Sequence, residues 1–132
     1  MILFVDDLEQ RYINFNRAFP EKEAAGTIWT GDSETACSAL LQFDITEVWL
    51  DHDAGDGGPV RLMWNQGSGS NVPTFFVVAQ MLAGMKFHGK VYVHTGNPAG
   101  ADRMLNLLKA HGIRVERPDS QVLTKIWGGV RP

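Results

Sequence analysis

Ile2-Leu3-Phe4-Val5-Asp6-Asp7 opens the chain with an apolar run of strand length that ends abruptly in two carboxylates. A continuous apolar run of this length is typical of a parallel strand that is buried on both faces of its sheet. Val48-Trp49-Leu50 has the same form and is followed by Asp51-His52-Asp53, and Val91-Tyr92-Val93 ends at His94. The three segments predict buried strands whose carboxyl ends carry polar side chains.

Helical patterns separate these strands along the chain. Apolar spacing and end signals predict helices over about 12–19, 33–43, 71–85 and 100–111, and Pro20 stops the first of them. Asp32 is the expected cap of the second helix, and Gly112 ends the last. Two more short strands are expected at 27–30 and 113–115, and a short helix at 60–64. This alternation predicts a doubly wound parallel α/β sheet of five strands, in the flavodoxin-like order 2-1-3-4-5.

Length and composition fit one ordinary globular domain. The chain has 132 residues, of which 44% are hydrophobic and 20% charged, so we expect a single domain over 1–132 with 118–132 as a C-terminal tail. A net charge of −3 excludes a general basic surface for nucleic acid, though not a local basic pocket. The single cysteine, Cys37, excludes a disulfide framework and a cysteine-based zinc site. No signal or membrane segment is visible, and we expect a cytoplasmic protein with no membrane partner.

The polar residues after the strands converge if the predicted order is right. Strands 1, 3 and 4 are then neighbours about 4.8 Å apart, so their ends lie within about 10 Å of each other, at the edge where α/β sheets bind ligands. Carboxylates held this close raise one another's pKa unless a cation lies between them. Asp6, Asp7 and Asp51 therefore indicate a site for Mg²⁺ or Mn²⁺, or for a phosphate group. The alternative for Asp6 and Asp7 is a structural turn or helix cap.

Two further groups of residues add chemistry to this edge. In an extended continuation of the strand, Asp51 and Asp53 point to one side and His52 to the other. The loop from His94 to Gly100 leads into a helix N-terminus, where free N–H groups favour an anion such as phosphate. Histidine is a general acid or base near neutral pH. Arg11 would either bind a phosphate oxygen or balance the acidic pair.

Three blocks in this order resemble one family, the cyclic-phosphate processing receiver domains. They are Phe4-Val5-Asp6-Asp7 with Arg11, Leu50-Asp51-His52-Asp53, and His94 to Gly100 with Met104. The resemblance covers Ile2 to about Leu108 and implies a receiver fold directed to cyclic phosphates, above all 2′,3′-cyclic ends of RNA or nucleotides. It also implies that Asp6 and Asp7 hold Mg²⁺ and that Asp51 stands at the phosphoacceptor position of ordinary receivers.

The chain differs from an ordinary receiver domain at three positions of the expected site. His94 stands where the fourth strand usually ends in Ser or Thr, Arg117-Pro118 replaces Lys-Pro, and His52-Asp53 follows Asp51 without the usual Met-Pro. Arginine does not present its charge as lysine does. Both His94 and Arg117 therefore argue against a conventional phosphorylation switch.

The leading hypothesis is a metal-assisted phosphoesterase that acts on a cyclic phosphate carried by a nucleotide or RNA end. The candidate residues are Asp51, His52 and His94 for catalysis, Arg11, Gly96, Asn97 and Gly100 for phosphate binding, and Asp6, Asp7, Asp51 and Asp53 for Mg²⁺ or Mn²⁺. The alternative is a receiver-like module that binds a cyclic nucleotide, a phosphate or a protein partner without turnover. A phosphorylatable receiver is the third hypothesis. The sequence sets no oligomeric state.

Overall fold

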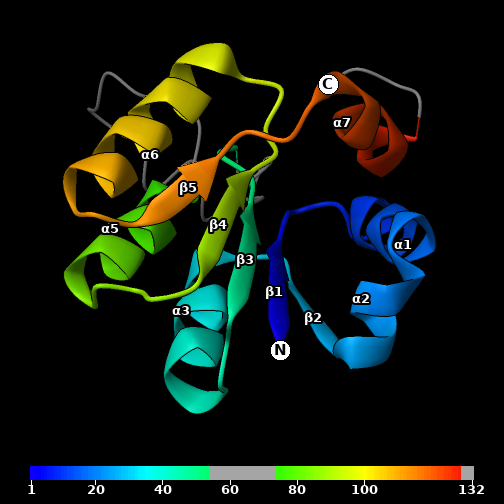
Figure 1. Cartoon of the computed structure of the whole chain (residues 1–132), viewed down its shortest axis with the longest axis horizontal. Coiled ribbons are helices and arrows are strands. Elements are labelled where there is room, and N and C mark those ends of the chain that lie inside the picture. Colours follow the sequence, from blue (N-terminus) through cyan, green and yellow to red (C-terminus); the bar gives the residue numbers. More distant parts are fainter. Residues whose placement is uncertain (54–73, 129–132) are drawn as a thin grey trace, which may run out of the picture.

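Five short strands form one parallel sheet in the order β2-β1-β3-β4-β5 (Figure 1). The computed structural model describes residues 1–53 and 74–128. Its strands are β1 (Ile2–Val5), β2 (Thr27–Thr30), β3 (Glu47–Leu50), β4 (Lys90–Val93) and β5 (Arg114–Glu116). The predicted single α/β domain with flavodoxin-like, receiver-like topology is confirmed.

Helices cover both faces of the sheet. On one side lie α3 (Ser33–Gln42), α5 (Phe76–Gly84) and α6 (Pro98–Ala110), and on the other lie α1 (Glu9–Ala18), α2 (Pro20–Ala25) and α7 (Ser120–Trp127) (Figure 1). Asp32 caps α3 as predicted, because its side chain accepts a hydrogen bond from the Thr35 N–H. Within the described ranges, no helix combines the length and apolar character that crossing a bilayer requires.

The strand residues alternate between two hydrophobic cores. Leu3 and Val5 of β1 face the core under α3, α5 and α6, whereas Ile2 and Phe4 face the core under α1 and α7. Phe15 of α1 and Ile126 of α7 are fully buried in the second core. Because both faces are covered, the sheet opens to solvent at the strand ends, and this is the edge on which β1, β3 and β4 place their polar residues.

Three elements differ from the sequence-based expectation. Pro20 does stop α1, but it also begins α2, since proline is favoured in the first turn of a helix. The C-terminal tail contains α7, capped by Asp119 and packed on α1. The helix expected from about residue 71 begins at Phe76, because Thr74 still pairs with Asp53 in an isolated bridge. The short helix expected at 60–64 lies outside the described residues.

Candidate functional site

Three carboxylates meet at the carboxyl edge of the sheet. Asp6 follows β1 directly and Asp51 follows β3 directly, and these two strands are paired in register. Asp6, Asp7 and Asp51 each offer an oxygen atom, and these atoms lie within 4.8 Å of one another. The predicted convergence of the three acids is therefore confirmed.

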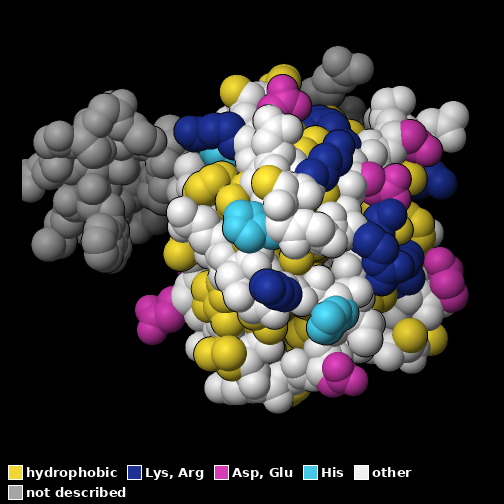
Figure 2. All heavy atoms as spheres, turned by 60° about the vertical axis from the view of Figure 1, so that its left-hand side comes forward, with side chains coloured by type: hydrophobic (Ala, Val, Ile, Leu, Met, Phe, Trp, Pro, Cys, Tyr) yellow, Lys and Arg dark blue, Asp and Glu magenta, His cyan; other side chains and the backbone are white. Residues whose placement is uncertain are grey.

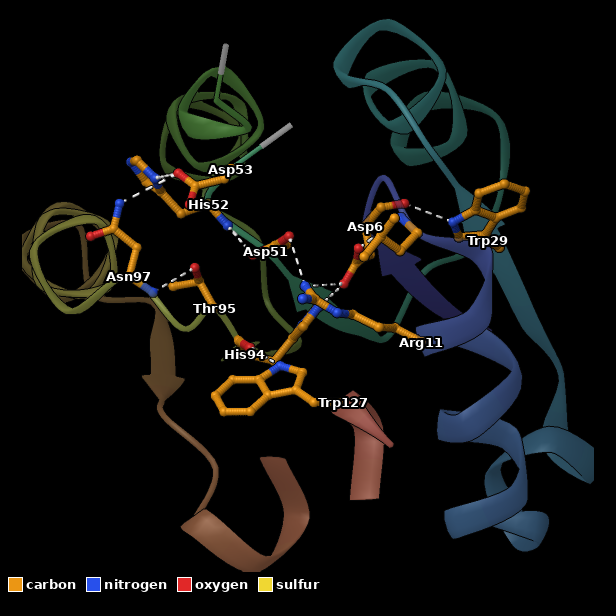
Figure 3. Close-up of polar contacts among 11 residues, drawn as sticks. Asp6, Arg11, Trp29, Asp51, His52, Asp53, His94, Thr95, Asn97 and Trp127 are labelled. Carbon is orange, nitrogen blue, oxygen red and sulfur yellow. Dashed lines mark hydrogen bonds and ion pairs between the residues drawn. The ribbon is translucent and has the colours of Figure 1, made fainter. Parts of the chain in front are cut away.

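Asp6 is fully buried, and neighbouring groups of the protein stabilise its negative charge. Its Oδ2 accepts a hydrogen bond from His94 Nε2 at 3.0 Å and one from Arg11 Nη1 at 3.4 Å, and its Oδ1 accepts one from the Leu8 N–H at 2.9 Å (Figure 3). Burial alone would raise the pKa of Asp6. The hydrogen bond and positive charge of His94, with Arg11 and the Leu8 N–H, outweigh burial and lower that pKa.

Asp7 and Asp51 differ from Asp6, because their pKa values are raised. Burial, followed by the negative charges of Asp6 and Asp51, raises the pKa of Asp7 from 3.8 to about 6. Burial is also the main reason that the pKa of Asp51 is raised, with a further contribution from Asp6. His94, Arg11 and the His52 N–H, which donates to Asp51 Oδ1 at 2.8 Å, reduce that rise. The surrounding groups therefore favour the ionised form of Asp6, whereas burial and the neighbouring carboxylates favour the protonated forms of Asp7 and Asp51.

Arg11 bridges two of these acids. Its Nη1 lies 3.4 Å from Asp6 Oδ2 and 3.6 Å from Asp51 Oδ2, and its side chain is 14% exposed. Of its two predicted roles, the structure shows the balancing contact with the acids (Figure 3). Because Arg11 also lines the cavity described below, binding of a phosphate oxygen remains a prediction for it.

Both candidate catalytic histidines are buried beside the cavity rather than in its wall. His94 is fully buried, stacks on Phe4 with ring centroids 4.7 Å apart, and contacts Asp6 through Nε2. His52 is 4% exposed, and its Nδ1 lies 2.8 Å from Asp53 Oδ1. Each imidazole therefore contacts a carboxylate that belongs to the predicted site.

A cavity of about 350 Å³ opens over the carboxylates. Asp51 and Asp53 both line it while His52 does not, in agreement with the predicted alternation. The remaining lining residues come from the loop after β1, the first turn of α1 and the loop after β4; they are Asp7, Leu8, Arg11, Thr95, Gly96 and Asn97. The cavity therefore combines acids, one arginine and the loop that leads into α6.

Asn97 and Gly100 hold the α6 end of this loop in place. Asn97 caps α6, because its Oδ1 accepts a hydrogen bond from the Gly100 N–H at 3.1 Å, and its Nδ2 donates to Asp53 Oδ1 at 3.4 Å. Gly100 does not line the cavity. Instead it packs on the His52 ring so closely that a Cβ there would lie 2.4 Å from His52 Cγ. Phosphate binding by Gly100 stays a prediction, while its observed role is close packing.

The donor set fits a hard divalent cation. Carboxylate oxygens are the ligands that Mg²⁺ and Mn²⁺ prefer, and a cation among them would offset the burial and mutual repulsion that raise the pKa values of Asp7 and Asp51. Asp6, Asp7 and Asp51 would hold the ion. Asp53, also predicted as a ligand, is not part of this cluster, and its Oδ1 is engaged by His52 and Asn97.

Two tryptophans support the site in a way that the sequence did not indicate. Trp29 Nε1 donates to the Asp6 carbonyl at 2.7 Å, and Trp127 Nε1 donates to the His94 carbonyl at 3.2 Å (Figure 3). Trp29 is placed by its register beside Phe4 across β1 and β2, and this pairing follows once the strand order is known. Trp127 comes from α7, and no periodicity in the sequence links that helix to the end of β4.

The sequence profile of the cyclic-phosphate processing receiver domain matches residues 1–110. The match ends within the last turn of α6, before β5 and α7, and it includes every carboxylate and histidine of the site. No curated protein matches the chain.

Proposed function

We propose that this chain, which belongs to the family of cyclic-phosphate processing receiver domains, is a metal-assisted phosphoesterase that opens a 2′,3′-cyclic phosphate on a nucleotide or RNA end. The observation that carries the proposal is the cluster of Asp6, Asp7 and Asp51, whose oxygen atoms lie within 4.8 Å of one another. Asp7 and Asp51 of this cluster line the cavity, and Asp6 is buried behind them. Such a cluster suits the hydrolysis of a phosphate ester, because a divalent cation held there would oppose the negative charge that develops on the phosphoryl oxygens.

In the proposed reaction, the oxygen of a water molecule forms a bond to phosphorus while one bond from phosphorus to a ribose oxygen breaks. The water loses a proton, the departing ribose oxygen gains one, and the product is a phosphate monoester. Bound Mg²⁺ or Mn²⁺ would supply positive charge against the negative charge that develops on the phosphoryl oxygens. Asp6, Asp7 and Asp51 are the residues that would hold it.

Neither buried histidine lines the cavity, so each would act through a carboxylate: His52 in proton transfer and His94 in positioning. Asp53 lines the cavity with its side chain 45% exposed, and its Oδ1 faces His52 Nδ1 at 2.8 Å. A proton taken up by Asp53 therefore has His52 as its immediate partner. His94, which is shut off from the cavity, holds Asp6 ionised and oriented, so we propose a positioning role for it. The sequence predicts that His52 and His94 take part in catalysis. Because both are buried, we propose that each acts through the carboxylate that it contacts.

Substrate oxygens would be held by Arg11 and by the loop of Gly96 and Asn97. The contacts of Arg11 with Asp6 and Asp51, at 3.4 and 3.6 Å, are longer than an optimal charged hydrogen bond, so a phosphoryl oxygen can compete for the guanidinium. Gly96 places backbone next to the cavity without a side chain, and Asn97 fixes the start of α6. Both features suit an anion that approaches the loop closely.

A binding module without turnover is the second candidate, and one arrangement favours it. Arg11 lies between Asp6 and Asp51 and so already supplies a cation to two of the three acids. A receiver-like domain of this kind would take up the cyclic phosphate and release it unchanged.

Turnover of 2′,3′-cyclic and 3′,5′-cyclic nucleotides in Mg²⁺ or Mn²⁺ separates the two candidates. We expect the 2′,3′-cyclic substrates to be opened by the wild type and by Asp102→Asn, which changes an exposed carboxylate of α6, but not by Asp51→Asn. If a cyclic nucleotide instead raises the melting temperature and is recovered intact, the binding module is correct and the phosphoesterase is not.

A further inference from the structure

A second cavity adjoins the carboxylate site and has a different chemistry. It measures about 420 Å³ and shares Gly96 with the first cavity. Its other lining residues come from the loop after β5 and from α7; they are Arg117, Pro118, Ser120, Leu123, Thr124 and Trp127. One cation, two hydroxyls and an apolar and aromatic wall thus stand next to the site of the proposed reaction.

The guanidinium of Arg117 has no acidic partner among the described residues. Its Nη1 is buried and has no hydrogen-bond partner among residues 1–53 and 74–128, and within those ranges Arg117 forms no ion pair. An unsatisfied buried donor on a guanidinium costs free energy and calls for an acceptor. Arginine is the side chain best suited to a phosphodiester, which offers it two oxygens in one plane.

Trp127 connects the wall of the second cavity to the end of β4. Its indole N–H is fixed on the carbonyl of His94, the residue that contacts Asp6, while the side chain also lines the second cavity (Figure 3). With Pro118 and Leu123 it forms a wall suited to the flat face of a nucleobase.

We infer that the second cavity is a subsite for the nucleotide that precedes the cyclic phosphate, with its phosphodiester on Arg117 and its base against Trp127. The inference rests on the proposed function for the cyclic end, and it identifies the substrate as an oligonucleotide end rather than a free mononucleotide. On the face shown in Figure 2, the Lys and Arg side chains are scattered among acidic and neutral ones. That distribution does not offer a continuous track for a long RNA.

The test compares uridine 2′,3′-cyclic phosphate with the dinucleotide that carries one more uridine and phosphodiester on its 5′ side. Dissociation constants are measured calorimetrically in EDTA, and kcat/KM is measured separately in Mg²⁺. We expect the wild type to prefer the dinucleotide about tenfold in both, as for a charged hydrogen-bond contact. Arg117→Gln should remove the preference, and Arg117→Lys should retain part of it.

Arg114→Gln is the matched control, since Arg114 is a nearby arginine that lies in β5 and contacts the His88 carbonyl outside the second cavity. It should keep the preference for the dinucleotide. Equal affinities for the two ligands, a preference that survives Arg117→Gln, or no binding at all would overturn the subsite. A preference in binding without any turnover supports the subsite and overturns the phosphoesterase, whereas turnover of both substrates without preference does the reverse.

Discussion

At the scale of single residues, the three clustered carboxylates are unequal. His94 and Arg11 hold the pKa of Asp6 below its ordinary value, whereas the pKa of Asp7 rises to about 6 with no cation beside it. Asp7 is therefore an acid whose ionised form a bound cation would favour, as it would for Asp51. This difference leads to a prediction for the metal-free protein.

Asp7→Asn should stabilise the metal-free protein at neutral pH. Because the folded pKa of Asp7, about 6, lies above 3.8, the folded state binds more protons than the unfolded chain between these values. The free energy of unfolding therefore falls as pH rises through this window. Removing the charge should restore about 1–2 kcal/mol, after allowance for the partial exposure of Asp7.

Melting temperatures in EDTA at about pH 4 and about pH 7.5 check this prediction. The gain from Asp7→Asn should be present at the higher pH and small at the lower one, and Asp102→Asn should show no such difference. Mg²⁺ should raise the melting temperature of the wild type and have little effect on Asp7→Asn. A variant that is less stable than the wild type at about pH 7.5 would contradict the account of the cluster.

His94 should matter to the fold as well as to the site. His94→Ala leaves a hole beside Phe4 and leaves Asp6 without its closest side-chain partner, so we expect a loss of about 2–5 kcal/mol in urea unfolding. His94→Gln can place an N–H near Asp6 and should lose less. An Ala variant with wild-type stability and full turnover would show that His94 has neither role.

At the scale of elements, α6 is held against the loop after β3 through Gly100. A Cβ at Gly100 would lie 2.4 Å from the His52 ring, so Gly100→Ala must move either the helix or the histidine. We expect a loss of about 1–3 kcal/mol, although alanine favours helix more than glycine does. Gly84→Ala, at a helical position with nothing within 4 Å, should instead be neutral or stabilising.

Urea unfolding of the two glycine variants gives the comparison directly. The close packing on His52 is correct only if the two substitutions have opposite or clearly different effects. Equal changes in both would mean that His52 yields freely and does not fix the start of α6.

Much of the element order could be predicted from the sequence. Buried parallel strands such as Ile2–Val5 are continuous apolar runs, and the residues after them are placed once the strand order is known. The burial of His52 and His94 could not be predicted, because it depends on Gly100 and Phe4, which approach from other elements. α7 was missed for a similar reason, since its partner α1 is distant in the sequence.

At the scale of the whole molecule, α7, which lies outside the family match, completes the core under α1. Ile126 is fully buried with Phe4 and Phe15, and the Asn14 side chain donates to its carbonyl at 3.0 Å. We propose that residues 1–132 unfold as one domain, with α7 an integral part of it. Ile126→Ala should then cost about 2–4 kcal/mol, whereas Ile13→Ala, at a position 37% exposed, should cost under about 1.

Chemical unfolding followed by both tryptophan fluorescence and circular dichroism tests the single-domain proposal. The two signals should give one midpoint in the wild type and a lower shared midpoint in Ile126→Ala. Two separate transitions, or an Ile126→Ala variant as stable as the wild type, would mean that α7 is an appendage.

The most direct test of the proposed function follows uridine 2′,3′-cyclic phosphate by phosphorus NMR in the presence of the wild-type protein and Mg²⁺. The account predicts that the cyclic phosphate signal is replaced by that of a monoester, and that EDTA or Asp51→Asn prevents the change. A cyclic phosphate signal that persists with the folded wild-type protein and Mg²⁺ would contradict it.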